Sequence, residues 1–502
     1  MTFGRGVLII CSMKYNLHRR AAEADNNGVI NPKKFIKYGG IGRERKMDKE
    51  SGKETVKNIE KWAAAAAANT KIPNELYPRF DVKRGLRDSN GKGVLAGLTN
   101  IGGIHSYYVD EGEIVPVDGE LFYRGYDIRQ LVDGFVREER FGFEEIVYLL
   151  LMGNLPNRAE LEAFQQELSG WRQRFPEDFT RGIILNMPSH SLMNSFARSV
   201  LSLHSLDPDA ESAEPEKVLK QCIRLIAIFP MLAVYSYYAA EYYHKGKSLV
   251  IHAPEAGYST AENFLHMLRK DNQFTPTEAR LLDILLVLHA EHGGGNNSTF
   301  TVHVVSSAGT DTYSVIAAAL GALKGTKHGG ANSKTPQMMK DLKQNVKDLT
   351  DEAELDAYLQ AVLDKKAFDR QGLIYGVGHA VYTLSDPREI LLKKYAADLA
   401  AEKGREEEFR LYQTVERLAP RLVMQQKGLK TPVAVNVDFY SGLIYDMLGI
   451  PEELLTPLFA VARIAGWCAH RLEESVNQSK IIRPAYKMVG ERKEYTKLSK
   501  RG

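Results

Sequence analysis

The sequence predicts a mainly α-helical protein with a minor β hairpin near the start of its core. After Asp127 nearly every segment has the apolar spacing of a helix, and capping residues, proline and glycine mark the helix starts and ends. Residues 106–123 differ, because short runs rich in β-branched and aromatic residues alternate there with turn residues. The sequence has no repeat of solenoid length and no GxGxxG or GxxxxGK loop, so dinucleotide and ATP sites of those kinds are not predicted.

Composition narrows the class of protein further. The chain has 502 residues, which at about 150 residues per domain indicates two or three domains. The formal net charge is +3 without a long block of one sign, so no nucleic-acid partner is expected. The three cysteines lie far apart and form no CxxC pair, which favours a reducing compartment. No apolar run approaches the ~20 residues that span a bilayer, so no membrane partner is expected.

Residues 1–96 are expected to form an N-terminal extension, partly disordered and with one helix. That helix contains the alanine run 63–68, and Asn69 and Pro73 should end it. No acidic residue occurs before Glu23, which is typical of an organelle transit segment. We favour a disordered extension or a later translation start for residues 1–46. We therefore expect a cytoplasmic protein, or a mitochondrial one if residues 1–46 are a transit segment.

The core is predicted to open with three short strands. These are residues 106–109, 114–117 and 121–123. Asp118-Gly119, between the last two, has the composition of a hairpin turn.

Three helix starts stand out in the rest of the core. Thr275 to Glu278 combine a capping box with proline at the first helical position. Asp311 is predicted to cap an alanine-rich helix, and Asp386, followed by proline, to cap a third.

Three histidines stand beside glycines at predicted helix ends: His292, His328 and His379. The backbone beside glycine can approach a ligand closely, and histidine is the commonest acid–base group. The alternative is that each is a capping or core residue. His289 and His292 share a helical face, but they do not form HExxH and no third ligand is near, so no metal site is predicted.

Charged residues near other helix starts complete the candidates. Arg388 falls at about the second position of the helix that Asp386 caps, where a guanidinium can bind a carboxylate; the alternative is an exposed arginine. Asp438 is either an N-cap or, with apolar neighbours, a carboxylate of raised basicity. Arg463, Trp467 and His470 recur on one helical face, and Arg483 precedes a proline near the end of the chain; either arginine alone would be read as a surface residue.

In this order, the segments resemble the citrate synthase family. Residues 376–388, GVGHAVYTLSDPR, are similar to its active-site signature along their whole length. The remaining matches are residues 121–128 with its opening hairpin, 327–332 with its first catalytic histidine loop, 436–442 with its catalytic aspartate segment and 463–470 with its C-terminal arginine helix. The likeness extends from about residue 97 to residue 488.

The resemblance implies an enzyme of the tricarboxylic acid cycle that condenses acetyl-CoA with oxaloacetate and water to give citrate and CoA. Asp438 would remove a methyl proton, His328 would donate a hydrogen bond to the thioester oxygen, and His379 would protonate the ketone of oxaloacetate. The oxaloacetate carboxylates would be held by His292, Arg388, Arg463 and Arg483. No tightly bound cofactor is implied, since acetyl-CoA is a co-substrate.

The family fold also implies a domain arrangement and a partner. A large helical domain would comprise residues 97–332 and 437–502, and a smaller helical domain, residues 333–436, would be inserted in it and close over the substrates. In the family the last arginine comes from the partner subunit, so Arg483 implies a homodimer with shared active sites.

Three positions depart from the family pattern, and one of them is Gly293, directly after His292, where many members have glutamate. Where some members carry basic residues soon after the signature histidine, this chain has Ala380 and Thr383. The CoA phosphates are therefore expected to contact other basic residues, of which the candidates are Lys365, Lys366, Arg370, Lys427 and Lys430.

Three alternatives to citrate synthesis stay open. A 2-methylcitrate synthase, using propionyl-CoA, would share every catalytic residue. A citryl-CoA lyase and a non-catalytic CoA-binding protein of the same fold are less favoured, the last because His328, His379 and Asp438 are all present.

Overall fold

The computed structural model describes residues 49–88, 92–111, 113–379, 381–429, 431–478 and 480–501. By its internal contacts the chain divides into two units, Met1–Leu95 and Ala96–Gly502. The first unit contains α1 (Lys49–Thr70) and α2 (Leu76–Arg79). Because α1 includes the alanine run and ends before Pro73, the helix expected there is confirmed, although it continues through Asn69 to Thr70. The predictions for residues 1–46 lie outside the described residues.

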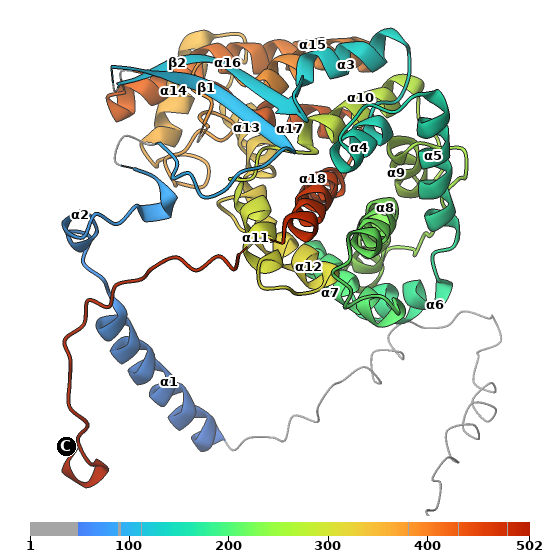
Figure 1. The fold of residues 1–502 in the computed structure, drawn as a ribbon. Coiled ribbons are helices and arrows are strands. Elements are labelled where there is room, and N and C mark those ends of the chain that lie inside the picture. The colour runs from blue at the N-terminus through green and yellow to red at the C-terminus, as the bar shows by residue number, and fades with distance from the viewer. Residues whose placement is uncertain are drawn as a thin grey trace, which may run out of the picture. The chain divides into compact units, whose positions relative to one another are not determined.

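The second unit is built almost wholly of helices, with one small sheet at its edge (Figure 1). Its first helices are α3 (Ile128–Arg137), α4 (Phe143–Met152), α5 (Arg158–Gln173), α6 (Glu177–Phe179), α7 (Leu192–Leu203), α8 (Pro215–Lys245), α9 (Thr260–Leu268) and α10 (Pro276–His289). The later ones are α11 (Asn297–Ser306), α12 (Thr312–Leu323), α13 (Lys334–Asn345), α14 (Glu352–Leu363), α15 (Pro387–Lys403), α16 (Glu406–Lys427), α17 (Val437–Met447) and α18 (Leu455–Asn477). The predicted class, mainly α with a minor hairpin, is confirmed.

The predicted helix starts are also observed. Thr275 caps α10 with both hydrogen bonds of a capping box, and Pro276 is its first helical residue. Asp311 accepts a hydrogen bond from the Ser314 N–H at the start of α12. Asp386 caps α15 in the same way. These starts are satisfied by side chains within three residues, so they were readable from local sequence.

The hairpin differs from the prediction. Strand β1 (Gly102–Asp110) pairs antiparallel with one long strand, β2 (Glu113–Tyr123), and β3 (Tyr126–Asp127) adds to its end. The turn therefore lies between β1 and β2, and the turn predicted at Asp118-Gly119 is wrong. The register shifts at that point, so that three residues of β2 lie opposite one residue of β1. A bulge tolerates the same residues as a turn, and only the pairing partner distinguishes them.

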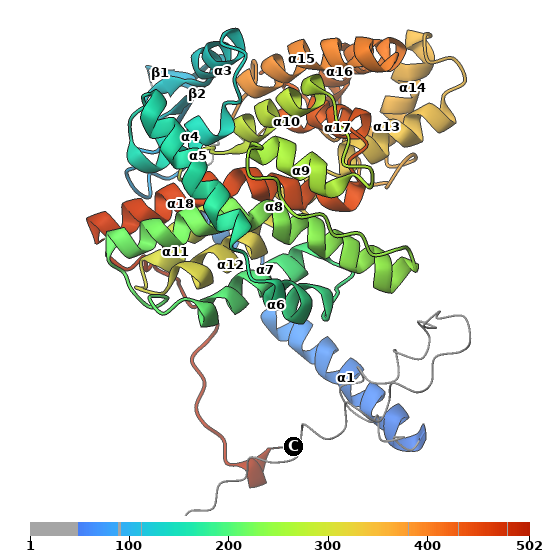
Figure 2. The same ribbon diagram turned by 90° about the vertical axis from the view of Figure 1, so that its right-hand side faces the viewer.

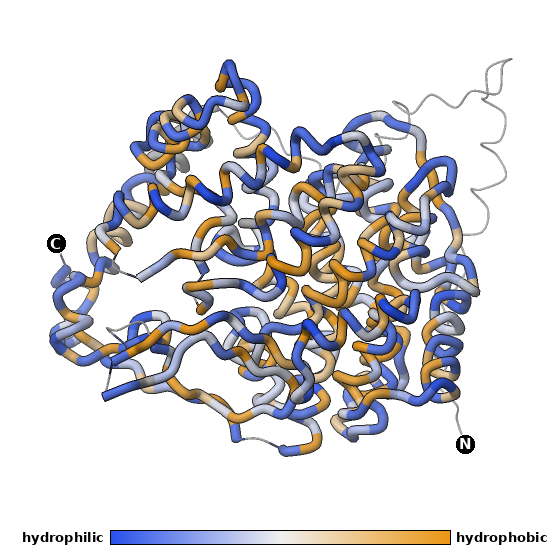
Figure 3. Tube along the Cα trace, turned by 90° about the horizontal axis from the view of Figure 1, so that it is seen from above, coloured by the Kyte–Doolittle hydropathy of each residue, from blue (hydrophilic) through white to orange (hydrophobic). Residues whose placement is uncertain are grey.

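Helices α8 and α18 form the centre of the second unit. They pack against each other, and every residue of α18 from Pro457 to Arg471 is buried. Apolar residues, drawn orange in Figure 3, concentrate in the interior of this unit, and polar residues lie mostly toward its outside. By length and composition α8 could cross a membrane, so the prediction that no apolar segment approaches membrane-spanning length is wrong. Within the protein, 78% of the most apolar 18-residue stretch of α8 is buried.

Helices α13 to α16 gather on one side of this unit (Figure 2). α14 packs against α16, α15 against α16, and α13 against α14. They fall within residues 333–436, for which a separate, mobile small domain stays a prediction.

Candidate active site

The two glycine-flanked histidines His292 and His379 are brought together although 87 positions separate them in the numbering. Their ring centroids are 5.2 Å apart, and the ring of Tyr382 lies 5.5 Å from His292 and 4.8 Å from His379. His292 follows the end of α10, whereas His379 lies in the loop before α15. Folding therefore creates a cluster that neither segment contains alone.

The orientation of His379 is set by its own loop. Its Nδ1 accepts hydrogen bonds from the backbone N–H groups of Val381 (3.0 Å) and Tyr382 (3.1 Å). Because Nδ1 is an acceptor, the neutral ring carries its proton on Nε2. The ring is thus arranged to donate a hydrogen bond or a proton from Nε2.

His328 is held by residues of α11 and α18. Its Nε2 is 3.0 Å from the Ser298 hydroxyl oxygen, which also accepts the Trp467 indole N–H at 3.1 Å. Burial, reinforced by Arg463, lowers the pKa of His328 to about 4. The ring is neutral at pH 7 and suits hydrogen bonding better than donation of a full proton.

Asp438 is the second residue of α17, and Asn436, not Asp438, caps that helix. The Asn436 side chain accepts the Asp438 N–H at 3.0 Å, so the N-cap alternative for Asp438 is wrong. Its carboxylate makes no hydrogen bond or ion pair with the described residues. Burial raises the pKa of Asp438 to about 6, although Arg388 and Arg463 act in the opposite direction. An ionised but poorly solvated carboxylate of this kind is a general base near neutral pH.

Arg388 is buried, which removes the alternative of an exposed arginine. Its Nε and Nη2 donate to the two carboxylate oxygens of Asp386, at 3.0 and 2.7 Å. Burial alone would lower the pKa of Arg388, but Asp386 outweighs it and holds the pKa above its usual value. Sequence reasoning assigned Asp386 only the capping role, although both roles use the same carboxylate.

Two further buried nitrogens have no hydrogen-bond partner in the part of the chain that the structure describes. Arg463 donates from Nε to the His289 carbonyl at 2.6 Å, but its Nη1 has no partner among the described residues. Nε2 of His292 is likewise buried and unpartnered. Burial, with help from Arg388, lowers the pKa of His292 well below its usual value, so the ring is neutral. Unpaired buried donors are costly, and an anionic ligand would satisfy them.

Arg483 is not brought to this cluster by its own chain. It lies beyond the end of α18 with an exposed side chain. The preceding residue, Ile482, donates its N–H to Ser307, at the end of α11. Its predicted reach into a partner's site stays a prediction.

The basic residues predicted for CoA phosphates are divided by the structure. Lys427 lines a cavity of about 390 Å³ together with His379 and Thr383. Lys365, Lys366 and Arg370 are exposed on the segment between α14 and α15, and Lys366 pairs with Asp364 at 2.9 Å. Lys430 and Ala380 lie outside the described residues. In the part of the chain that is described, no group of three metal-binding side chains could hold a metal ion.

The bulge of β2 is hydrogen-bonded to the loop that runs from His379 to Arg388, a contact that sequence reasoning missed. The Ser385 hydroxyl donates to the Asp118 carboxylate (2.8 Å) and accepts the Gly119 N–H (3.1 Å). Ser106, opposite the bulge, donates to the Val381 carbonyl at 2.9 Å. A β-carbon on Gly119 would lie only 2.2 Å from the Ser385 carbonyl oxygen.

Replacing Gly119 with alanine is therefore expected to displace the signature loop. We expect a loss of kcat/KM of about tenfold or more and a destabilisation of ~1–3 kcal/mol, the usual result of overpacking. Gly103→Ala in β1 is the matched control, because its β-carbon would make only an ordinary contact at 4.0 Å. Steady-state kinetics and thermal unfolding measure both effects. Equal kinetics for the two variants would contradict the inference that contact with the β2 bulge positions the signature loop.

Buried nitrogens without a partner among the described residues, together with a carboxylate of raised pKa, are typical of an acid–base active site. Comparison with known proteins identifies the family to which this chain belongs. The family model described as "Citrate synthase, C-terminal domain" matches residues 92–485. The chain belongs to the citrate synthase family, whose members transfer an acyl group, and the resemblance read from the sequence is confirmed.

Individual relatives agree with this assignment. The chain is 39% identical over 359 residues to the citrate synthase of Deinococcus radiodurans, covering 71% of this chain and 88% of the relative. It is 33% identical to a 2-methylcitrate synthase of Shewanella oneidensis, with coverages of 74% and 88%. The crystal structure of citrate synthase from Thermotoga maritima has a TM-score of 0.64 at 30% identity, with coverages of 84% and 99%.

Proposed function

We propose that the protein condenses acetyl-CoA with oxaloacetate and water to give citrate and CoA. The observation that carries the proposal is the pair of buried nitrogens without a partner among the described residues, Arg463 Nη1 and His292 Nε2, together with the raised pKa of Asp438, on which Arg463 acts. Oxaloacetate carries two carboxylates and a ketone, and these groups can accept such hydrogen bonds. Arg388 adds a second buried positive charge, although Asp386 already occupies two of its nitrogens.

The first step is enol formation. Asp438 removes a proton from the acetyl methyl group, and the electron pair left on carbon moves toward the thioester oxygen. His328 donates a hydrogen bond to that oxygen from Nδ1. This requires the Ser298 hydroxyl to donate to His328 Nε2 in place of Asn296, which it reaches at 3.0 Å. A neutral His328 then stabilises an enol instead of a free enolate.

The second step forms the carbon–carbon bond. The enol carbon attacks the ketone carbon of oxaloacetate, and His379 Nε2 supplies a proton to the developing alkoxide. The proton that Asp438 took in the first step replaces it, so that His379 returns to its neutral form and Asp438 to its ionised form. Backbone N–H groups at Nδ1 hold the ring in the tautomer that this transfer needs. Water then hydrolyses the citryl thioester and releases CoA, which makes the overall reaction effectively irreversible.

Synthesis of 2-methylcitrate from propionyl-CoA is the second candidate. The Shewanella oneidensis relative, a 2-methylcitrate synthase at 33% identity, favours keeping it. The two acyl groups differ by one methylene, which a pocket distinguishes by only ~1–3 kcal/mol. Citrate synthesis stands first because the relative with 39% identity is a citrate synthase.

We also propose a homodimer, a closing small domain and a cytoplasmic location. Arg483 is exposed on the segment after α18, away from its own chain's cluster, as expected of a residue that serves a partner subunit. The small domain, residues 333–436, would carry His379 and Arg388, so its closure would assemble the site and exclude water.

For the CoA phosphates we retain Lys427 as the first candidate, because it lines the cavity beside His379.

Release of free CoA thiol by the purified protein tests the proposal. We expect rapid release from acetyl-CoA that depends on oxaloacetate. The ratio of kcat/KM for acetyl-CoA to that for propionyl-CoA decides between the two syntheses. No release from either thioester by folded protein would overturn the proposal.

A further inference from the structure

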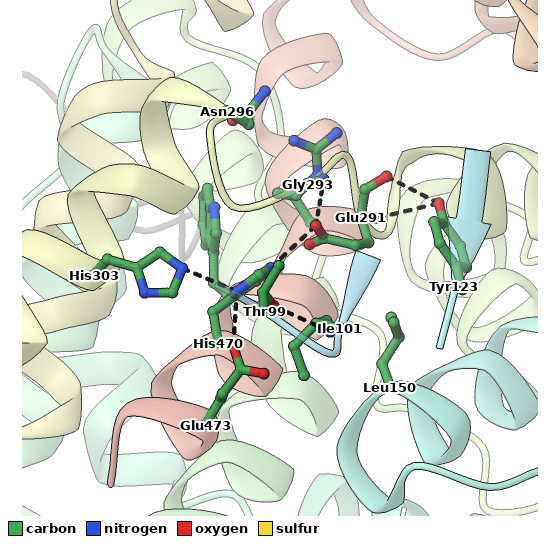
Figure 4. Close-up of polar contacts among 12 residues, drawn as sticks. Thr99, Ile101, Tyr123, Leu150, Glu291, Gly293, Asn296, His303, His470 and Glu473 are labelled. Atoms are coloured by element: carbon green, nitrogen blue, oxygen red, sulfur yellow. Dashed lines mark hydrogen bonds and ion pairs between the residues drawn. The ribbon is translucent and has the colours of Figure 1, made fainter. Parts of the chain in front are cut away.

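A chain of four hydrogen-bonded side chains runs through the core beside the proposed oxaloacetate site. Glu474 Oε1 is 2.5 Å from His303 Nδ1, His303 Nε2 is 3.0 Å from His470 Nδ1, and His470 Nε2 is 3.1 Å from Glu291 Oε1. Figure 4 shows His470 between His303 on α11 and Glu291 beyond α10. Glu291 and His470 are completely buried. One member of this hydrogen-bonded chain is His470, which shares a helical face with Arg463 but has no role in the proposed reaction.

This hydrogen-bonded chain of side chains needs one proton more than two neutral histidine rings supply. Each of its three hydrogen bonds needs one hydrogen between the two atoms that it joins. These atoms are ring nitrogens and carboxylate oxygens, which bind each other only through a hydrogen. Two neutral rings carry two hydrogens in total, and ionised carboxylates carry none. With both carboxylates ionised, the third hydrogen makes one imidazolium that the two rings share. In that arrangement the inner end of the chain is an ionised Glu291 facing a His470–His303 pair that holds one positive charge.

Charges on every side are consistent with an ionised Glu291. Burial would raise the pKa of Glu291, but His470 and Arg463 outweigh it and hold the pKa below its usual value. Glu473 Oε2 lies 3.8 Å from His470 Nδ1 and adds negative charge on the histidine side. An ionised carboxylate at this depth is tolerated only while its partners stay in place.

The backbone is shaped to admit this carboxylate. A β-carbon on Gly466 would lie 2.2 Å from Glu291 Oε2, and one on Gly102 would lie 2.8 Å from Glu291 Cγ. The Tyr123 hydroxyl accepts the Glu291 N–H at 3.2 Å and shares its one hydrogen between the carbonyls of Val287 (2.9 Å) and Glu291 (3.1 Å). The position is thus closed around Glu291 from α18, β1 and β2.

The same carboxylate sets the backbone that carries His292. Glu291 Oε1 accepts the Gly293 N–H at 2.5 Å, and Gly293 has a φ of +78°, in the left-handed region. His292 stands between these two residues, so its ring direction depends on the turn that the Glu291 side chain closes. Movement of Glu291 would move the unpartnered Nε2 of His292 away from the ligand.

We propose that His470 is a positioning residue of the oxaloacetate site, acting through an ionised Glu291 that holds the Glu291–Gly293 turn and with it His292. The proposal rests on the proposed function, because it assigns His292 to oxaloacetate. It separates His470 from the catalytic residues, since it touches no reacting atom.

The test compares His470→Gln with the double variant Glu291→Gln/His470→Gln. Glutamine can still donate toward Glu291 but cannot carry the positive charge. We expect His470→Gln to weaken oxaloacetate binding about tenfold or more in calorimetry, to change kcat at saturation by less than about threefold, and to lower the unfolding midpoint. Removing the stranded charge in the double variant should recover part of both losses.

The control is His204→Gln, which breaks a His–Glu pair with exposed Glu211 (2.8 Å) outside the site and should leave oxaloacetate binding unchanged. If His470→Gln does not fold, His303→Gln at the outer end of the chain should weaken oxaloacetate binding in the same direction. Unchanged affinity in His470→Gln, or in His303→Gln if that variant replaces it, overturns the proposal, as does a double variant no better than His470→Gln in either measurement. A wild-type protein that does not bind oxaloacetate would count against the proposed function, while the unfolding midpoints would still test the charge pairing.

Discussion

Replacing Asp438 with asparagine is expected to lower kcat by about three orders of magnitude, within the ~10²–10⁴ range of general base catalysis. The amide cannot take the methyl proton, and no other carboxylate is proposed for that step. Oxaloacetate should still bind nearly as well, because its proposed ligands, Arg388, Arg463 and His292, are unchanged. Stopped-flow or steady-state CoA release gives kcat, and calorimetry gives the oxaloacetate Kd.

The wild-type pH profile provides a second measurement of the same role. Asp438 must be ionised to act, and its pKa of about 6 means that the active form is lost as pH falls through that value. Below it, kcat/KM should fall by about tenfold per pH unit. Asp446→Asn, an exposed aspartate on the same helix, is the control and should leave kcat unchanged. Near-normal turnover by Asp438→Asn would show that the base has been wrongly assigned.

Replacing Arg388 with leucine is expected to raise the oxaloacetate KM by about a hundredfold or more, because a buried guanidinium near the proposed ligand is removed. The structure adds a second effect. Asp386 is completely buried, and its bidentate partner would be lost, which typically costs ~3–5 kcal/mol. Thermal unfolding should therefore show a lower midpoint in addition to the kinetic defect.

The two effects can be separated by a second substitution. Asp386→Asn/Arg388→Leu removes the stranded charge, so stability should partly return while oxaloacetate binding stays weak. Arg410→Leu, an exposed arginine on α16, is the control for loss of one guanidinium. Recovery of both stability and affinity in the double variant would mean that Arg388 is structural and does not hold the substrate.

Several features were determined by the sequence alone because their physics is local. The capping box at Thr275, the caps Asp311 and Asp386, and the end of α1 before Pro73 depend on interactions within a few residues. The mainly helical class follows from apolar spacing, which acts at the same range. Glycine-flanked His292, His328 and His379 could be chosen as candidates for the same reason. Their separate roles came only from the family resemblance.

Other features depended on partners far away in the chain. Asp118-Gly119 suits a turn or a bulge, and its pairing with β1 and contact with Ser385, 266 positions away from Gly119, decided for the bulge. The length and composition of α8 would allow a membrane span, yet the surrounding helices bury it. Glu291 and His470, 179 positions apart, show no signal of pairing in either segment. Burial and long-range pairing determine pKa values and orient the site, and both arise only when distant segments pack together.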